Sequence, residues 1–188
     1  MKKSVKIIIA VVVIAVILIA LLAGVYNGMV NAQANAETAF SNIETQLQRR
    51  FDLVPNLVET VKGASAHEQN VINSVTEARA KYAGAGSVSE KAEAAGEFSS
   101  ALSRLMVVVE NYPTITSTPS YIALQDELAG TENRINIARQ DYNAAATEYN
   151  KLIRKFPNVI FAGMFGFDQM SLFEAASGAE TAPQVSFQ

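Results

Sequence analysis

The sequence contains no cysteine, no tryptophan and a single histidine, His67. Without cysteine it can form no disulfide, no thiolate metal site, no cysteine nucleophile and no lipoprotein acylation site. One histidine cannot supply the paired Glu-x-x-His motifs of a di-iron bundle or the ligand set of a zinc enzyme. The sequence also lacks a glycine-rich phosphate loop, a nucleophile elbow and a Ser/His/Asp set. We therefore expect no enzyme activity, catalytic residue, metal or cofactor, and we place His67 at the surface or at a helix junction.

An uncharged apolar run extends from Ile7 to Val25 and consists mainly of Ile, Val, Leu and Ala. At about 1.5 Å per residue, a helix of this length nearly spans the ~30 Å hydrocarbon core of a bilayer. Lys2, Lys3 and Lys6 precede the run, which favours a cytoplasmic N-terminus with the rest of the chain outside. We therefore expect a single-pass protein of the bacterial cell membrane, with residues 7–25 in the lipid bilayer.

A cleavable signal sequence is the alternative, because Ala32-Gln33-Ala34 fits a small-x-small cleavage site. The apolar core of such a signal is normally about 7–15 residues long, which favours an uncleaved anchor. Beyond the anchor, and without Lys2, Lys3 and Lys6, 12 basic residues remain against 18 acidic ones. This acidic balance argues against nucleic acid as a partner and against electrostatic adhesion to anionic lipid.

The remaining chain shows the apolar spacing of amphipathic helices, in steps of three and four residues. Gly84 to Ser87 is expected to end one helix and Ser89 to cap the next, while residues 114–118 form a loop before Pro119 begins the last helix. The positions expected in the core are Phe40, Ile43, Leu47, Phe51, Val54, Val58, Val61, Val71, Val75, Ala78, Tyr82, Ala95, Phe98, Leu102, Leu105, Val109, Tyr112, Tyr121, Leu124, Leu128, Ile135, Ala138, Tyr142, Ala145, Tyr149, Leu152 and Phe156.

These segments predict an all-α fold, in which an N-terminal transmembrane helix is followed by an antiparallel up-and-down helical bundle of long helices. If the first helix turns between Gly63 and His67, its length from Tyr26 matches that of the last helix, with two shorter helices between them. We prefer this four-helix arrangement, which returns Phe156 to the membrane end of the first helix. The alternative has three helices, with a kinked first helix that continues to Lys81.

Charged residues interrupt the apolar stripe of the first helix at Arg49, Arg50 and Asp52, close to Pro55. The proline is expected to bend the helix near Phe51, or else Asp52 caps a new helix. Our hypothesis is that the three charged side chains satisfy each other and the freed carbonyls at the bend. The bend would then set the angle between the bundle and its anchor.

Charges also flank the apolar stripe of the last helix, at Glu132, Arg134 and Arg139. Buried charges need partners, so we expect these residues, with Arg49 and Arg50, to form ion pairs that fix the register between helices. The functional alternative is a polar groove in which arginine side chains bind a partner's carboxylate.

Tyr142-Asn143 and Tyr149-Asn150 lie seven residues apart, so they share one face of a helix. Tyr26-Asn27 repeats the pair where the chain leaves the membrane, and a tyrosine there suits the interfacial aromatic belt. We expect stacked tyrosines with amide partners to lock the register of neighbouring helices rather than to bind a ligand. In the four-helix arrangement, Tyr26 and Tyr149 would approach each other near the bilayer.

The segment from Phe156 to Phe173 contains five phenylalanines, and Pro157, Gly163 and Gly166 predict no regular helix of any length within it. Our first interpretation is that it folds over an open end of the bundle and completes the core. The second is that its aromatic side chains enter the membrane interface beside the anchor. Residues 174–188 are expected to form a flexible C-terminal tail.

Several short motifs, in order along the chain, resemble those of the LemA family of bacterial membrane-anchored helical-bundle proteins. The resemblance covers about residues 26–173 and implies a transmembrane segment, an antiparallel bundle and no established enzymatic activity. It names no active-site residues, and some relatives are associated with magnetosome membranes or envelope homeostasis. The matching motifs are Tyr26-Asn27, Gln46-Leu47-Gln48-Arg49-Arg50, Asp52-Leu53-Val54-Pro55-Asn56-Leu57-Val58, Val61-Lys62-Gly63, Ala78-Arg79-Ala80, Glu110-Asn111-Tyr112-Pro113, Glu132-Asn133, Ala138-Arg139, Tyr142-Asn143, Tyr149-Asn150 and Phe156-Pro157.

The expected organisation is a cytoplasmic tip and anchor at residues 1–25, a LemA-like bundle at 26–173 and a flexible tail at 174–188. We expect a non-enzymatic scaffold or adaptor of the bacterial envelope that assembles with itself or with other envelope proteins. The alternative is a sensor or regulatory subunit that binds a ligand or a membrane enzyme, such as a protease, and modulates it.

Overall fold

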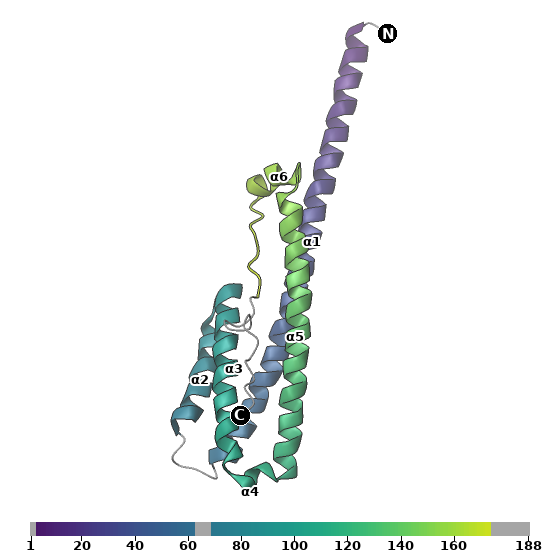
Figure 1. The fold of residues 1–188 in the computed structure, drawn as a ribbon. Coiled ribbons are helices and arrows are strands. Elements are labelled where there is room, and N and C mark those ends of the chain that lie inside the picture. The colour runs from purple at the N-terminus through teal and green to yellow at the C-terminus, as the bar shows by residue number, and fades with distance from the viewer. Residues whose placement is uncertain (1–2, 63–68, 174–188) are drawn as a thin grey trace, which may run out of the picture.

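The structure, a computed structural model, describes residues 3–62 and 69–173, and this part of the chain contains helices and no strands. The all-α prediction is therefore confirmed for the described residues. In Figure 1, α1 and α5 run side by side along the molecule, and the shorter α2 and α3 pair beside the part of α1 and α5 farthest from the N-terminus. The helices are α1 (Lys3–Lys62), α2 (Gln69–Gly84), α3 (Val88–Glu110), α4 (Pro113–Thr116), α5 (Pro119–Arg154) and α6 (Asn158–Phe165).

The N-terminal part of α1 projects beyond the bundle as a free apolar helix (Figure 1). The large apolar side chains between Ile7 and Leu22 are 40–65% exposed. Among the described residues, one helix is long and apolar enough to cross a membrane, within Lys6–Glu59, and none of its most apolar stretch is buried. Apolar side chains that face water along a whole helix suggest that a membrane surrounds it.

The four-helix arrangement is confirmed, because α2 packs against α3 and runs antiparallel to α1 instead of continuing it (Figure 1). Helices α1, α2, α3 and α5 run alternately down and up in Figure 1, which returns the end of α5 to the anchor side of the molecule. The expected turn between residues 63 and 67, and with it His67, lies outside the described residues.

Helix α1 stays continuous across Pro55, which is exposed. A proline ring on the solvent side leaves the packed face intact, although the Phe51 carbonyl loses its usual N–H partner. Asp52 lies inside α1, so the expectation that it caps a new helix is wrong. Pro55 lies near the distal end of α1, and a bend there would move the last turns of the helix rather than the anchor.

Two expected boundaries were wrong. Ser87 rather than Ser89 caps α3, through a capping box in which the Ser87 hydroxyl accepts from the Glu90 N–H and the Glu90 carboxylate accepts from the Ser87 N–H. The expected loop after Pro113 is the four-residue helix α4, because proline is favoured at the first position of a helix. The expectation that residues 156–173 contain no regular helix was also wrong: α6 forms between Pro157 and Gly166 and includes Gly163.

The expected core positions that the structure describes are largely buried, and they belong mainly to one large cluster shared by α1, α2, α3 and α5. The side chain of Val61 lies outside the described ones. Phe156 is the clear exception, at 82% exposed, because α5 ends at Arg154 and Phe156 leaves the apolar stripe. The sequence pattern also missed several buried positions beside the apolar stripe of each helix. A helix in a bundle buries a wider face than the two positions per seven residues that form such a stripe. The missed positions are Leu57, Ile72, Ala146 and Ile153.

A second, smaller core lies at the membrane-proximal end, where Met29 of α1 packs with Tyr149, Ile153 and Ala162. Met29 is fully buried. Cleavage after the Ala32-Gln33-Ala34 stretch would remove Met29 from this core.

Candidate functional site

After α6 the chain runs back along α5 as an extended segment, which we call the strap (residues 168–173) and which Figure 1 shows between α5 and α3. The reversal occurs at Gly166, which ends α6 in the left-handed conformation with φ 75°. Glycine suits this position because it has no Cβ to clash there. The last strap residue, Phe173, is buried against Phe40 and Tyr142.

Two asparagines of α5 bind the strap backbone through paired hydrogen bonds. Asn143 Nδ2 donates to the Phe173 carbonyl at 2.8 Å, and the Phe173 N–H donates to Asn143 Oδ1 at 2.9 Å. Asn150 Nδ2 donates to the Met170 carbonyl at 2.8 Å, and the Met170 N–H donates to Asn150 Oδ1 at 2.9 Å. Each side-chain amide therefore pairs with one strap residue as a neighbouring strand would.

The two tyrosines complete the same pattern. The Tyr142 hydroxyl donates to the Ser171 carbonyl at 2.7 Å, and the Tyr149 hydroxyl donates to the Asp168 carbonyl at 2.9 Å. Both tyrosine side chains are about 1% exposed. Burial raises the pKa of both phenols, which therefore remain hydrogen-bond donors at neutral pH.

The spacing of the motif explains the fit. Seven residues of a helix rise by about 10 Å, and three residues of an extended chain cover about the same distance. The seven-residue spacing on α5 therefore matches a three-residue spacing on the strap. The two tyrosines bind Asp168 and Ser171, and the two asparagines bind Met170 and Phe173.

The two Tyr-Asn pairs of α5 thus bind the strap, and they do not form the predicted stack of tyrosines between two helices. Tyr26 packs edge-on against Phe165 and Phe167 at centroid distances of 5.2 and 5.7 Å, and its ring contacts are with these side chains rather than with Tyr149. Sequence reasoning identified the Tyr-Asn pairs but missed their partner, because they bind backbone groups that any residue carries.

Arg50 forms a buried polar contact between three helices. It is 6% exposed, donates to Ser99 of α3 at 3.1 Å, and forms an ion pair with Glu132 of α5. Its guanidinium also lies 5.8 Å from the ring centroid of Phe98. Burial lowers the pKa of Arg50, while the Glu132 carboxylate opposes this shift.

Arg139 adds a second cation to this layer. Its guanidinium lies 5.5 Å from the ring centroid of Phe173, and burial lowers its pKa while Glu132 opposes the shift. Arg139 in turn contributes to the lowered pKa of Arg50. The Glu132 carboxylate therefore interacts electrostatically with both Arg50 and Arg139 and partly compensates both positive charges.

The other predicted charges pair near the surface. Arg49 lies 2.7 Å from Glu127, which also lies 2.9 Å from Arg134. Asp52 accepts from Gln48 at 2.8 Å and lies 3.8 Å from Arg79. The ion pairs of Arg49 and Arg50 thus join α1 to α5, and Asp52 faces α2 instead of either arginine. Arg134 pairs with Glu127 within α5, so the expectation that it pairs between helices is wrong.

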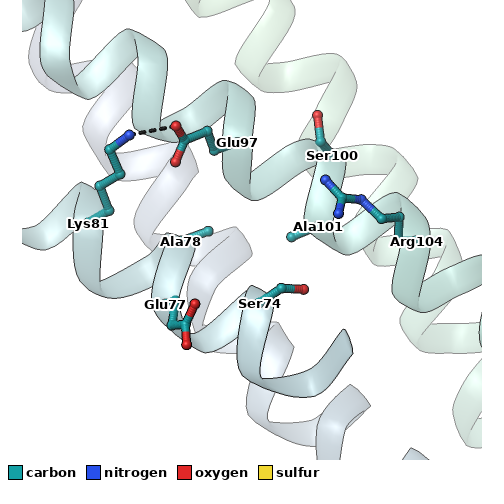
Figure 2. A pocket seen from close by; sticks show the side chains of 8 residues that line it. All are labelled: Ser74, Glu77, Ala78, Lys81, Glu97, Ser100, Ala101 and Arg104. Atoms are coloured by element: carbon teal, nitrogen blue, oxygen red, sulfur yellow. Dashed lines mark hydrogen bonds and ion pairs between the residues drawn. The ribbon is translucent and has the colours of Figure 1, made fainter. Parts of the chain in front are cut away.

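A groove of about 590 Å³ lies between α2 and α3. Figure 2 shows the Lys81–Glu97 ion pair, at 2.5 Å, at one end and Arg104 at the other. Its remaining lining is small or acidic, from Ser74, Glu77, Ala78, Ser100 and Ala101. No three His, Asp or Glu side chains gather as a metal site within residues 3–62 and 69–173.

Comparisons with known proteins agree with the family resemblance. The LemA family profile matches residues 39–187. The chain is 32% identical over 167 residues to the magnetosome proteins MamQ 1 and MamQ 2 of Paramagnetospirillum magneticum, with 75% of this chain and 61% of each relative covered. It is 30% identical over 174 residues to the magnetosome protein MamQ of Magnetospirillum gryphiswaldense, with 77% and 64% covered. The chain thus spans less than two thirds of the length of these relatives, and it belongs to the LemA family.

Proposed function

We propose that this protein is a membrane-anchored, non-enzymatic scaffold or adaptor of the bacterial envelope. One observation carries the proposal: α1 passes as a single helix from its free apolar part into the bundle core, where it packs along α5. A continuous helix links the anchor rigidly to the bundle, so the bundle projects from the bilayer as a rod. The distal α2 and α3 pair is then presented to partners away from the lipid.

The distal part of the rod carries features that suit protein partners. Val107 of α3 is 60% exposed and Ile122 of α5 is 48% exposed. The charged groove between α2 and α3 lies on the same part of the rod. The relation to magnetosome proteins fits a role in organising membranes.

Photocrosslinking in cells tests this proposal. A photoreactive amino acid replaces Ser100 in the groove or Val107 beside it, and the buried Leu105 provides the matched control on the same helix. Adducts to a second copy or to another envelope protein from Ser100 or Val107, without adducts from Leu105, support a scaffold. Only lipid adducts or none from these exposed positions would overturn it.

We further propose that the bundle is extracytoplasmic, which rests on the three lysines before the anchor. The natural chain has no cysteine, so a single Ser100→Cys variant provides a clean probe. A membrane-impermeant maleimide should label this variant in intact cells as fully as in lysed cells. Labelling only after lysis would place the bundle in the cytoplasm.

A hollow of about 510 Å³ beside the strap favours the regulatory alternative. It is lined by Phe40, Tyr142, Met170 and Glu37, among others. A ligand bound there would contact both α1 and the strap, and so would link occupancy to the position of the strap. A compound that stabilises the folded protein by about 2–3 kcal/mol near 100 times its Kd would support this role.

A further inference from the structure

Helix α6 is apolar around its whole circumference. Phe161 and Ala162 face the membrane-proximal core with Met29 and Tyr149. The opposite stripe is exposed, with Val159 at 49%, Ile160 at 53% and Met164 at 72%. Positions 156, 159, 160 and 164 repeat at the spacing of one helical face, and 82% of Phe156 is exposed just before the helix. A helix that is apolar on both faces normally has apolar surroundings on both.

The exposed face of α6 lies beside the point where α1 leaves the bundle. In Figure 1, α6 lies across the end of α5 next to α1, just where the free apolar part of α1 begins. Phe165 contacts Tyr26 with a centroid distance of 5.2 Å, and Tyr26 directly follows the apolar run of residues 7–25. Since that run spans about 30 Å, Tyr26 and Phe165 lie at the boundary between hydrocarbon and headgroups.

Basic side chains outnumber acidic ones at this end, where Asp168 and Glu37 are the acidic residues close enough to Tyr149 to add to the effect of burial in raising its pKa. Lys151, Arg154 and Lys155 are exposed at the end of α5, and residues 149–167 contain no acidic residue. On α1, residues 7–36 are uncharged. Although the net charge of the whole bundle is negative, three basic side chains lie together at its membrane-proximal end, where they can interact with the anionic headgroups of a bacterial membrane.

We propose that α6 is a second membrane contact, with its exposed face inserted at the headgroup boundary and the three basic side chains among the headgroups. This inference rests on the proposed anchoring through residues 7–25. Its occupant is the lipid bilayer rather than a second copy, because the patch continues the surface of the anchor and the basic residues lie beside it. Two contacts, the anchor and α6, would fix the tilt of the rod as a single span cannot.

Single tryptophans provide the test, because the natural chain has none. Full-length Ile160→Trp and its matched control Ile137→Trp, whose parent residues are 53% and 51% exposed, are reconstituted in vesicles of phosphatidylcholine and phosphatidylglycerol. Brominated acyl chains quench tryptophans that lie at or below the interface. We expect about a twofold loss of fluorescence for Ile160→Trp and little change for Ile137→Trp.

A Val16→Trp variant separates this inference from the anchoring on which it rests. Quenching of Val16→Trp without quenching of Ile160→Trp overturns the α6 contact alone. Absence of quenching in Val16→Trp overturns the anchoring. A blue-shifted but unquenched Ile160→Trp, with a shift that grows with protein density, assigns the patch to a second copy and also overturns the proposal. Circular dichroism verifies that each variant is folded.

Discussion

Asn143 and Phe173 lie thirty residues apart in the chain and exchange two hydrogen bonds, at 2.8 and 2.9 Å. The side chain of one helical residue thereby satisfies both backbone groups of a residue in an extended segment. Asn150 repeats the arrangement with Met170 one step nearer the membrane. The strap therefore owes its position to specific polar contacts as well as to the burial of Phe173.

Replacing Asn143 with alanine tests this arrangement. The substitution leaves the N–H and carbonyl of Phe173 without their partners, so we expect the unfolding free energy to fall by about 1–3 kcal/mol. Faster amide hydrogen exchange in residues 168–173 should accompany the loss. The control is Asn133→Ala on an exposed position of the same helix, which carries the same gain in helix propensity of about 0.5 kcal/mol. Equal stability and equal exchange in both variants would refute the role of Asn143.

Glu132 is the second target, because Arg50 and Arg139 both depend on its charge. Glu132→Gln keeps the shape but leaves a buried arginine without a counter-charge. Because the Glu132 side chain is 40% exposed and water can partly replace it, we expect a loss of about 1–3 kcal/mol, measured by urea unfolding in detergent. The double variant Arg50→Met with Glu132→Gln should recover much of this loss, since it removes the buried cation as well.

The neighbouring pair of Arg49 and Glu127 provides the matched comparison for that experiment. The two carboxylates are similarly exposed, at 36% for Glu127 and 40% for Glu132, but Arg49 is 57% exposed and Arg50 only 8%. Exposed ion pairs contribute about 0–1 kcal/mol, so Arg49→Met should cost less than about 1 kcal/mol. If Arg49→Met and Glu132→Gln are equally destabilising, burial does not control the strength of these contacts.

The sequence predicted the helices and most of the core because apolar spacing reports which face a helix buries. The equal lengths of the first and last long helices also predicted the four-helix arrangement and the return of the chain to the membrane end. Phe156 was misplaced because spacing alone does not show that α5 stops at Arg154. Ser87 was missed as a cap in favour of Ser89, although Glu90 three residues after Ser87 is the sequence signal of a capping box.

Sequence analysis predicted one side of the candidate site, the Tyr-Asn repeat, but not the strap that it binds. The Tyr-Asn repeat was visible at once, because identical dipeptides seven residues apart share a helix face. Its partner was not visible, since hydrogen bonds to the backbone carry no residue signature. The charged residues were expected to pair across helices, but the sequence could not show that Arg50 is buried while adjacent Arg49 is exposed.

Replacing Pro55 tests whether the proline acts as a hinge that sets the angle between the anchor and the bundle. Pro55→Ala restores an N–H for the Phe51 carbonyl on an exposed side of α1, so we expect stability to rise by about 1–2 kcal/mol. Spin labels on the anchor and on α5 should show an unchanged angle, because Pro55 lies at the distal end. Asn42→Ala controls for propensity, and a changed angle would restore the hinge hypothesis.

Tyr82 makes a prediction about alkaline pH. Its hydroxyl is buried and has no hydrogen-bond partner among the described residues. Burial, reinforced by Glu44 and opposed by Arg139, raises the pKa of Tyr82 to about 12 from an ordinary 10.0. The folded protein therefore keeps this proton where the unfolded chain has lost it. The resulting contribution to stability is fully present below pH 10 and is lost as the pH rises toward 12.

Tyr82→Phe should remove that alkaline loss. At pH 7 the variant should be as stable as the natural protein, or more stable by up to about 1 kcal/mol, because it deletes an unpaired buried hydroxyl. Tyr142→Phe is the matched control: it removes a hydroxyl that donates to Ser171 at 2.7 Å and should cost about 0.5–1.5 kcal/mol at pH 7. Urea unfolding in detergent at pH 7 and pH 11 measures both. A destabilised Tyr82→Phe at pH 7 would mean that the Tyr82 hydroxyl has a partner, and the argument from its isolation would fail.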